Sequence, residues 1–270
     1  MATYKELKGI TLQQLSSDPP AIITGDVWYN SSTGSLKAGV LAGAWASGPN
    51  YPTALSGMGG CGTAIAALGF GGSAASTVSA EYDGSSWTAN PGLNTGRSSA
   101  AGFGIQTSAV SVGGDLYPGA TRWTNYTEYY AGSTWTAATV TPTAVSGGSG
   151  FGTYAAGVVA GGSGAPSYTA QSAVNHYASG SWTAATALPT GIKYAGSVGT
   201  QTAGLVIAGY TGPNENTSRV ATVNEYDGEG WTAAPSVGNA RNGMGACGTT
   251  ALALIYGGRF NSPPNPTNIQ

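Results

Sequence analysis

The side chains best suited to binding a ligand stand in loops that follow short apolar runs ending in glycine. Tyrosine and tryptophan offer a flat apolar face with a polar group, and amides and guanidinium groups add directional hydrogen bonds. This mixture suits stacking against a carbohydrate or docking of a protein, and tolerated loop variation without any ligand is the alternative. The candidate ligand-binding or partner-binding residues are Tyr117, Arg122, Trp123, Tyr168, Tyr210, Asn214 and Arg219.

Residues that catalysis or metal binding would need are sparse. The chain has 11 acidic residues and one histidine, His176, which we expect to be a solvated strand residue. Glu81, Asp83, Glu225 and Asp227 recur with the repeat described below, which predicts turn and strand-edge positions. No acid and base stand out as a pair, and no cysteine and histidine spacing fits a metal site. We therefore expect no enzyme activity, no catalytic residues, no metal and no cofactor.

Composition narrows the range of partners. Only 7% of residues are charged and the net charge is −2, so no basic field is available and we expect no nucleic-acid partner. The sequence contains no apolar run of about 18 residues, which predicts no membrane insertion. It also shows no signal peptide, so we expect synthesis in a cytoplasm.

The loops are positioned by a repeat, which tryptophan marks at intervals of 42, 48, 47 and 49 residues. A second marker, Cys, Phe or Val followed by Gly, comes 16 residues after each of these tryptophans. A period of 40 to 50 residues with β-type patterning is typical of propeller blades. The two sets of markers are Trp45, Trp87, Trp135, Trp182 and Trp231, and Cys61, Phe103, Phe151, Val198 and Cys247.

One repeat reads as four short strands. A hairpin is predicted from Val78 to Tyr82 and from Trp87 onward, with a turn at Asp83 to Ser86 between its strands. Two further strands are predicted at Ser99 to Thr107 and at Ala109 to Gly113. The small residues of the first strand in each blade predict inner strands that approach closely around an axis. The larger side chain in each inner strand either plugs the channel or faces the neighbouring blade.

The ends of the repeat array are complementary. The first copy has Val40 in place of the blade tyrosine, and the last stops at Gly258. We therefore predict an all-β, five-bladed propeller over residues 36–270, in which strands near Leu36 to Ser47 close the ring by completing the blade begun by Asn242 to Gly258. Residues 1–35 form an N-terminal arm and hairpin. The five variable loops leave their blades in one direction and gather on one face.

The order of a glycine doublet, Glu-Tyr and Trp, as in GFGG…EYDGSSW and IAGY…NEYDGEGW, resembles the kelch repeat over residues ~40–258. The resemblance implies a kelch-like propeller, although kelch propellers often have six or seven blades. Some kelch-like proteins are copper oxidases, but that chemistry needs several imidazole and tyrosine ligands, and His176 is the single histidine.

The N-terminal segment carries a second resemblance. MATYKELKG, SSDPP and GDVWYNSSTGSLK are similar to the opening of tail-fibre and other virion appendage proteins of bacteriophages, especially marine ones. The alternative is a hairpin that only caps the propeller.

The resemblance implies a non-enzymatic structural protein of the phage virion: a tail fibre, a head fibre or a capsid decoration. Its partners would be capsid, tail or fibre proteins, attached through Trp28 and Tyr29, and its propeller would be displayed to a host-surface glycan or protein. The alternative is a free-standing kelch-like module that binds glycan or protein. The oligomeric state stays open.

Overall fold

A computed structural model describes residues 13–17, 19, 27–38, 47–117, 122–164, 168–213 and 217–260. The chain separates into two compact units, Met1–Gly48 and Pro49–Gln270. The described residues form strands and loops, and no helix occurs among them. Of the predicted site residues, Asn214 lies outside the described ranges.

The N-terminal unit contains a three-stranded sheet. β1 (Gln13–Leu15) pairs in parallel with β2 (Val27–Asn30), and β3 (Ser35–Ala38) pairs antiparallel with β2. The turn between β2 and β3 is held by the Asn30 side chain, whose oxygen accepts backbone hydrogen bonds from Ser32 and Thr33 at 3.1 Å. The predicted hairpin is therefore confirmed. Trp28 is buried, and Tyr29 is half-buried.

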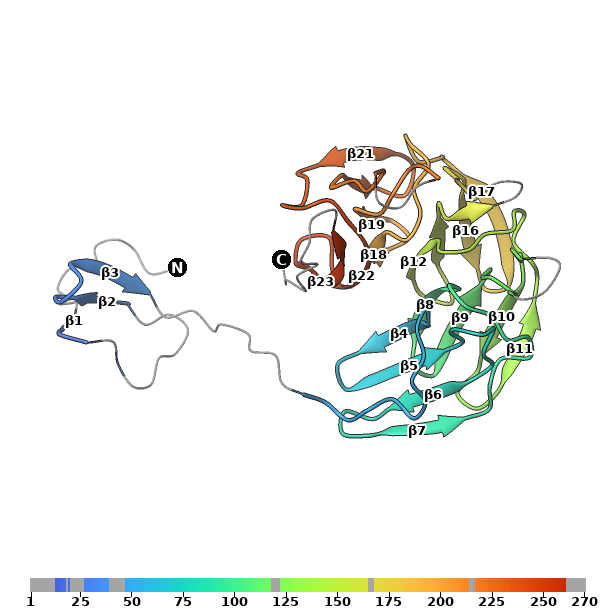
Figure 1. The fold of residues 1–270 in the computed structure, drawn as a ribbon, viewed down its shortest axis with the longest axis horizontal. Coiled ribbons are helices and arrows are strands. Elements are labelled where there is room, and N and C mark those ends of the chain that lie inside the picture. Colours follow the sequence, from blue (N-terminus) through green and yellow to red (C-terminus); the bar gives the residue numbers. More distant parts are fainter. Residues whose placement is uncertain are drawn as a thin grey trace. The chain divides into compact units, whose positions relative to one another are not determined.

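The second unit is a β-propeller whose complete blades are four-stranded antiparallel sheets. The inner strands β4, β8, β12 and β18 are neighbours in that order around the centre (Figure 1). The blades are β4 (Gly59–Thr63), β5 (Ala66–Phe70), β6 (Ser79–Tyr82) and β7 (Trp87–Asn90); β8 (Ala101–Ile105), β9 (Ser108–Val112), β10 (Thr127–Tyr130) and β11 (Trp135–Ala138); β12 (Ser149–Gly152), β13 (Gly157–Ala160), β16 (Val174–Ala178) and β17 (Ser181–Ala185); and β18 (Gly196–Thr200), β19 (Ala203–Ile207), β20 (Val223–Tyr226) and β21 (Trp231–Ala234). A small hairpin, β14 (Ser163–Gly164) and β15 (Thr169–Ala170), extends from the third blade.

The number of blades corrects the sequence-based prediction. The described residues form four complete blades rather than five, and β22 (Arg241–Gly248) and β23 (Ala253–Phe260) add a sheet of two strands. Leu36 was expected to help complete that sheet, but it lies in β3 and pairs with Tyr29 of β2. Trp45 lies outside the described residues, so closure of the ring stays a prediction.

Glycine in the inner strands allows their close approach. A Cβ atom on Gly102 would lie 2.9 Å from the carbonyl oxygen of Gly60, and one on Gly150 would lie 2.7 Å from that of Gly102. Real Cβ atoms do not occupy such positions, so any larger residue would push neighbouring blades apart. The prediction that small residues line the inner strands for steric reasons is confirmed.

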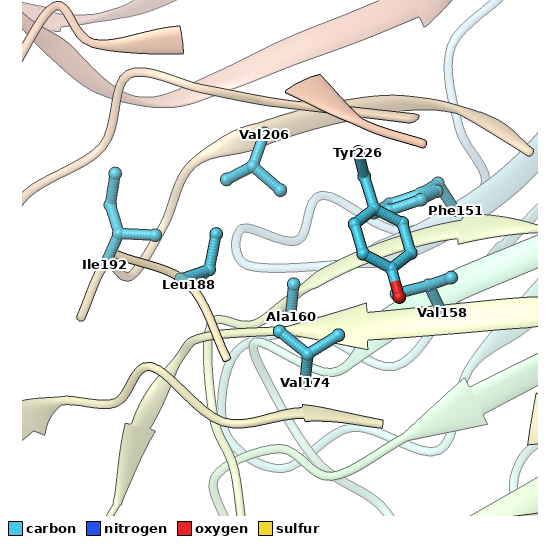
Figure 2. Packing of buried hydrophobic residues seen from close by; sticks show 8 residues of the cluster. All are labelled: Phe151, Val158, Ala160, Val174, Leu188, Ile192, Val206 and Tyr226. Carbon is cyan, nitrogen blue, oxygen red and sulfur yellow. The ribbon is translucent and has the colours of Figure 1, made fainter. Parts of the chain in front are cut away.

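Each blade after the first packs aromatic side chains against the blade before it. Figure 2 shows this interface between the third and fourth blades, where Tyr226 lies with Phe151 and Val158. The Phe151 ring covers Gly204 of the fourth blade, as Phe103 covers Gly157 of the third. These two larger inner-strand side chains therefore pack against the neighbouring blade. Of the two alternatives, a plug of the central channel or a contact with the next blade, the second is confirmed for Phe103 and Phe151.

The repeat also links blades by a hydrogen bond to the tyrosine hydroxyl. Tyr130 donates to Glu81 of the preceding blade at 2.7 Å, and His176, at the equivalent place, lies 2.8 Å from the Tyr226 hydroxyl. Tyr226 itself donates to the Gly228 carbonyl, so the imidazole is the donor to Tyr226. His176 is thus half-buried and bonded rather than solvated, because its repeat position faces the next blade. Burial lowers its pKa.

The interface between the fourth blade and β23 differs from the others. Its buried cluster contains Leu205, Val223 and Ile255 but no tyrosine or tryptophan among the described residues. A cavity of about 420 Å³ lies there, lined by Leu205, Val223, Pro235, Val237 and Ile255. An aromatic pair fills the matching space in each of the three other interfaces.

The buried blade tryptophans should dominate local stability. Trp135 is 5% exposed, packs edge-on against Phe70 at 4.9 Å between ring centroids, and donates its indole N–H to Ser79. We expect Trp135→Ala to lower the free energy of unfolding by about 3–5 kcal/mol, as for other buried large aromatics. Thr136→Ala, at the exposed next residue, should change it by about 0.5 kcal/mol or less. Urea denaturation measures both, and a Trp135→Ala loss below about 1 kcal/mol would contradict the packing seen here.

Candidate functional site: the mouth of the propeller

Five equivalent residues surround one end of the central axis, and we call them the mouth ring. Four of them stand just before an inner strand and the fifth, Gly243, lies within β22. All five have a left-handed backbone, at φ values from 53° to 63°. Successive members are joined by backbone N–H to carbonyl hydrogen bonds of 2.7 to 2.9 Å. Because the strands are antiparallel, the loops between second and third strands open at this same end. The mouth ring consists of Gly57, Ser99, Gly147, Tyr194 and Gly243.

A pocket of about 270 Å³ opens at the mouth ring. Apart from the ring itself, it is lined by Met58, Ala100, Gly148, Ala195 and Met244. No charged side chain is among these described residues, and the lining mixes small groups, two flexible thioethers, one serine hydroxyl and one phenol ring. Such a lining favours an uncharged ligand with an apolar face.

A polar cluster lies beside the mouth ring and joins four of the predicted site residues. The Arg122 guanidinium forms an ion pair with Asp115 at 2.8 Å and donates to the Tyr168 hydroxyl at 2.8 Å. It also lies over the rings of Tyr117 and Tyr168, at 5.1 and 5.0 Å from their centroids. The hydrogen bond to Asp115 is the main cause of a raised pKa at Arg122. Trp123 packs edge-on against Tyr168 at 5.4 Å.

A buried lysine connects this cluster to the mouth ring. Lys193 is 1% exposed, donates to the backbone carbonyl of Tyr168, and lies over the rings of Tyr168 and Tyr210. No ion pair joins it to a carboxylate within the described residues, unlike the buried Arg97, which is paired with Glu128 at 2.6 Å. Burial therefore lowers the pKa of Lys193, because the charged form loses its hydration.

The Lys193–Tyr194 pair departs from the repeat. The equivalent pairs in the repeat are Ser56–Gly57, Ser98–Ser99, Ser146–Gly147 and Asn242–Gly243. Ser98, Ser146 and Asn242 form backbone bridges like that of Lys193, and the Ser56 carbonyl accepts a hydrogen bond from the Ser73 N–H. A left-handed backbone at a residue with a large side chain costs about 1–3 kcal/mol. The Tyr194 ring stacks on Tyr210 with planes parallel to within 1° and centroids 5.6 Å apart. The fourth blade thus carries a strained aromatic platform where the other blades have small residues.

The structure brings most of the predicted ligand-binding residues together. Tyr117 is exposed, Arg122, Trp123 and Tyr168 are partly exposed, and all four contact one another through the polar cluster. Tyr210 was expected on the surface but is 7% exposed, because it packs on Lys193 and Tyr194. Arg219 is also buried. Its guanidinium donates to the Asn242 side chain and the Phe260 carbonyl, which gives it a role in holding the fold.

Three residues of the site were missed in the sequence: Asp115, Lys193 and Tyr194. A register-by-register alignment of the repeats would have found the last two, because Ser-Gly becomes Lys-Tyr in one copy. No sequence signal predicts the Asp115–Arg122 ion pair, since Asp115 stands where other repeats have serine, tyrosine or arginine.

Two other kinds of site are absent from the described residues. No group of three or more His, Cys, Asp and Glu side chains is placed to hold a metal ion. In the same ranges, no helix is long and apolar enough to cross a membrane.

Comparison with known proteins identifies the fold. No protein-family model matches the chain, and no curated protein matches it in sequence. Among solved structures, a protein named YjhT is similar, with a TM-score of 0.64 over 78% of this chain and 75% of that chain. The two sequences are 18% identical, so the likeness shows the β-propeller fold alone.

Lys193 should make stability depend on pH. Its pKa in the folded protein is lowered from 10.5, so between the lowered value and 10.5 the unfolded chain binds the proton and the folded chain does not. We expect stability to rise with pH through that window. Lys193→Met should abolish this increase of the free energy of unfolding with pH, and should raise the free energy of unfolding at neutral pH. Lys37→Met, in the N-terminal unit, is the control for the loss of one positive charge. Parallel urea-midpoint profiles for wild type and Lys193→Met would contradict the burial cost.

Proposed function

We propose that this protein is a non-enzymatic binding protein of a bacteriophage virion, in which the N-terminal unit attaches to the particle and the propeller presents its mouth to a host-surface ligand. The particle component would be a tail fibre, a head fibre or a capsid decoration. The kelch-like character of the repeat is part of the same proposal, and it rests on the glycine doublet, Glu-Tyr and Trp pattern of the sequence.

The observation that carries the binding role is the concentration of aromatic and cationic side chains at one end of the propeller. Tyr117, Arg122, Trp123 and Tyr168 come from two loops that are far apart in sequence, and they form one contiguous cluster. The Trp123 indole N–H is buried and has no hydrogen-bond partner among the described residues. A ligand acceptor at this N–H would remove the cost of leaving it unpaired.

The attachment role is supported by the separate compactness of the N-terminal unit and by its resemblance to virion appendage proteins. Trp28 is 3% exposed, so its ring stabilises the three-stranded sheet, while Tyr29 is partly exposed. Attachment through this unit would therefore use Tyr29 and the exposed Val27 more than the Trp28 ring. The second candidate function is a free-standing glycan-binding or protein-binding module, which the mouth cluster supports equally.

Deleting the arm separates the two candidates. We expect removal of residues 1–34 to abolish incorporation into the particle while the propeller keeps its circular-dichroism spectrum and Tm. Ser32→Ala, in the exposed turn of the hairpin, should incorporate normally. Normal occupancy of the deleted form would make the propeller itself the docking surface, and the absence of the full-length protein from purified particles would favour the free-standing module.

Substitutions at the mouth should have the opposite effect. Tyr117→Ala combined with Trp123→Ala should spare incorporation and weaken host adsorption through lost stacking area. Thr136→Ala, on an outer strand, is the matched control. Unchanged adsorption by the double variant, at normal occupancy, would remove the mouth cluster from host recognition.

Ring closure by the rest of the predicted segment, residues 39–47 beyond β3, remains a prediction. It is supported by the cavity beside Leu205, Val223 and Ile255, and by the fact that β23 pairs only with β22 among the described strands. Deleting residues 39–47, which leaves β3 intact, should leave a strand edge uncovered and cause aggregation. Size-exclusion chromatography and a thermal melt measure the effect, and a monomer with unchanged Tm would show that this segment does not close the ring.

A further inference from the structure

The pocket at the mouth ring is distinct from the polar cluster, and its lining defines a ligand. Its volume of about 270 Å³ is near the lower end of small-molecule pockets, about 300 Å³, which suits one ring rather than an extended chain. Tyr194 is the one aromatic residue among the described lining residues, and Ser99 contributes a hydroxyl.

Tyr194 is held rigidly where it lines the pocket. Its N–H donates to the Gly147 carbonyl at 2.8 Å, and its own carbonyl accepts from Gly243 at 2.9 Å. The ring is held by the stack with Tyr210, and a Cβ atom on Gly147 would lie only 2.8 Å from it. A side chain fixed in this way loses little conformational freedom when a ligand binds.

Folding does not require an aromatic side chain at this position. Gly57, Gly147 and Gly243 provide the same left-handed backbone in the same place, at φ values of 62° to 63°. Backbone strain at a site that glycine would relieve points to a role other than stability.

We propose that the mouth pocket binds a single uncharged pyranose ring, such as a terminal hexose of a surface glycan, with the apolar C–H face of the sugar stacked on Tyr194 and a sugar hydroxyl bonded to Ser99. The lack of charged lining residues within the described ranges selects a neutral sugar over a carboxylated or phosphorylated one. This inference rests on the proposed binding function and names its ligand class.

The test uses the methyl glycosides of glucose, galactose, mannose and N-acetylglucosamine as probes, with the open-chain polyol sorbitol as the control ligand. Saturation-transfer NMR on the full-length protein should show transfer to the ring C–H protons of at least one methyl glycoside and none to sorbitol. Tyr194→Gly should abolish this signal or weaken affinity about tenfold or more, and Tyr194→Phe should retain it.

The Tyr194→Gly variant is a control on folding as well. Because it restores the residue found at Gly57, Gly147 and Gly243, its Tm should be equal to that of the wild type or higher. Absence of transfer to every methyl glycoside, or an unchanged signal in Tyr194→Gly, would overturn the proposal. Host adsorption could depend on Tyr117 and Trp123 and still be normal in Tyr194→Gly. That result would overturn the pyranose site and would leave the proposed binding function intact.

Discussion

The packing of each blade's aromatic side chains into the preceding blade is the interaction on which the rest of the structure depends. The inner strands are short and rich in glycine and alanine, so most of the larger apolar side chains come from the second, third and outer strands. Tyr130 with Trp135, Tyr177 with Trp182, and Tyr226 with Trp231 supply most of the large side chains in three successive interfaces. No such pair lies at the interface beside β23 among the described residues, and a cavity of about 420 Å³ is found there.

The same packing fixes where a binding site can form. The stacking of the blades brings the five residues of the mouth ring together in succession, joined by backbone hydrogen bonds, and the loops that follow the glycine doublets open beside them. The Asp115–Arg122 pair, Tyr168 and Lys193 come from loops of three blades, and the packing of those blades brings them into contact. A propeller of this kind therefore supplies a fixed frame on which loop residues vary without disturbing the core.

The sequence predicted features that repeat and missed features that occur once. The tryptophan period, the hairpin at Asp83 and the small inner strands follow from local chemistry copied several times, so each copy supports the others. The number of blades was wrong because Leu36 pairs within the N-terminal sheet, and that choice depends on a competing strand rather than on the repeat. The burial of Tyr210 was missed for a similar reason, since its partners Lys193 and Tyr194 are single departures from small residues.

These departures are concentrated in one blade, and both act against stability. A buried lysine without a carboxylate partner in the described residues, and a tyrosine with a left-handed backbone, each disfavour the folded state by an amount comparable with a single unfavourable mutation. The other repeats satisfy the same backbone geometry with serine, asparagine and glycine. Lys193 and Tyr194 are neighbours in the sequence, and both contact the Tyr210 ring. They lie side by side, with the Lys193 ammonium between Tyr168 and Tyr210 and the Tyr194 ring at the pocket. This arrangement is expected when an aromatic platform is selected for binding and the packed interfaces between blades offset the lost stability.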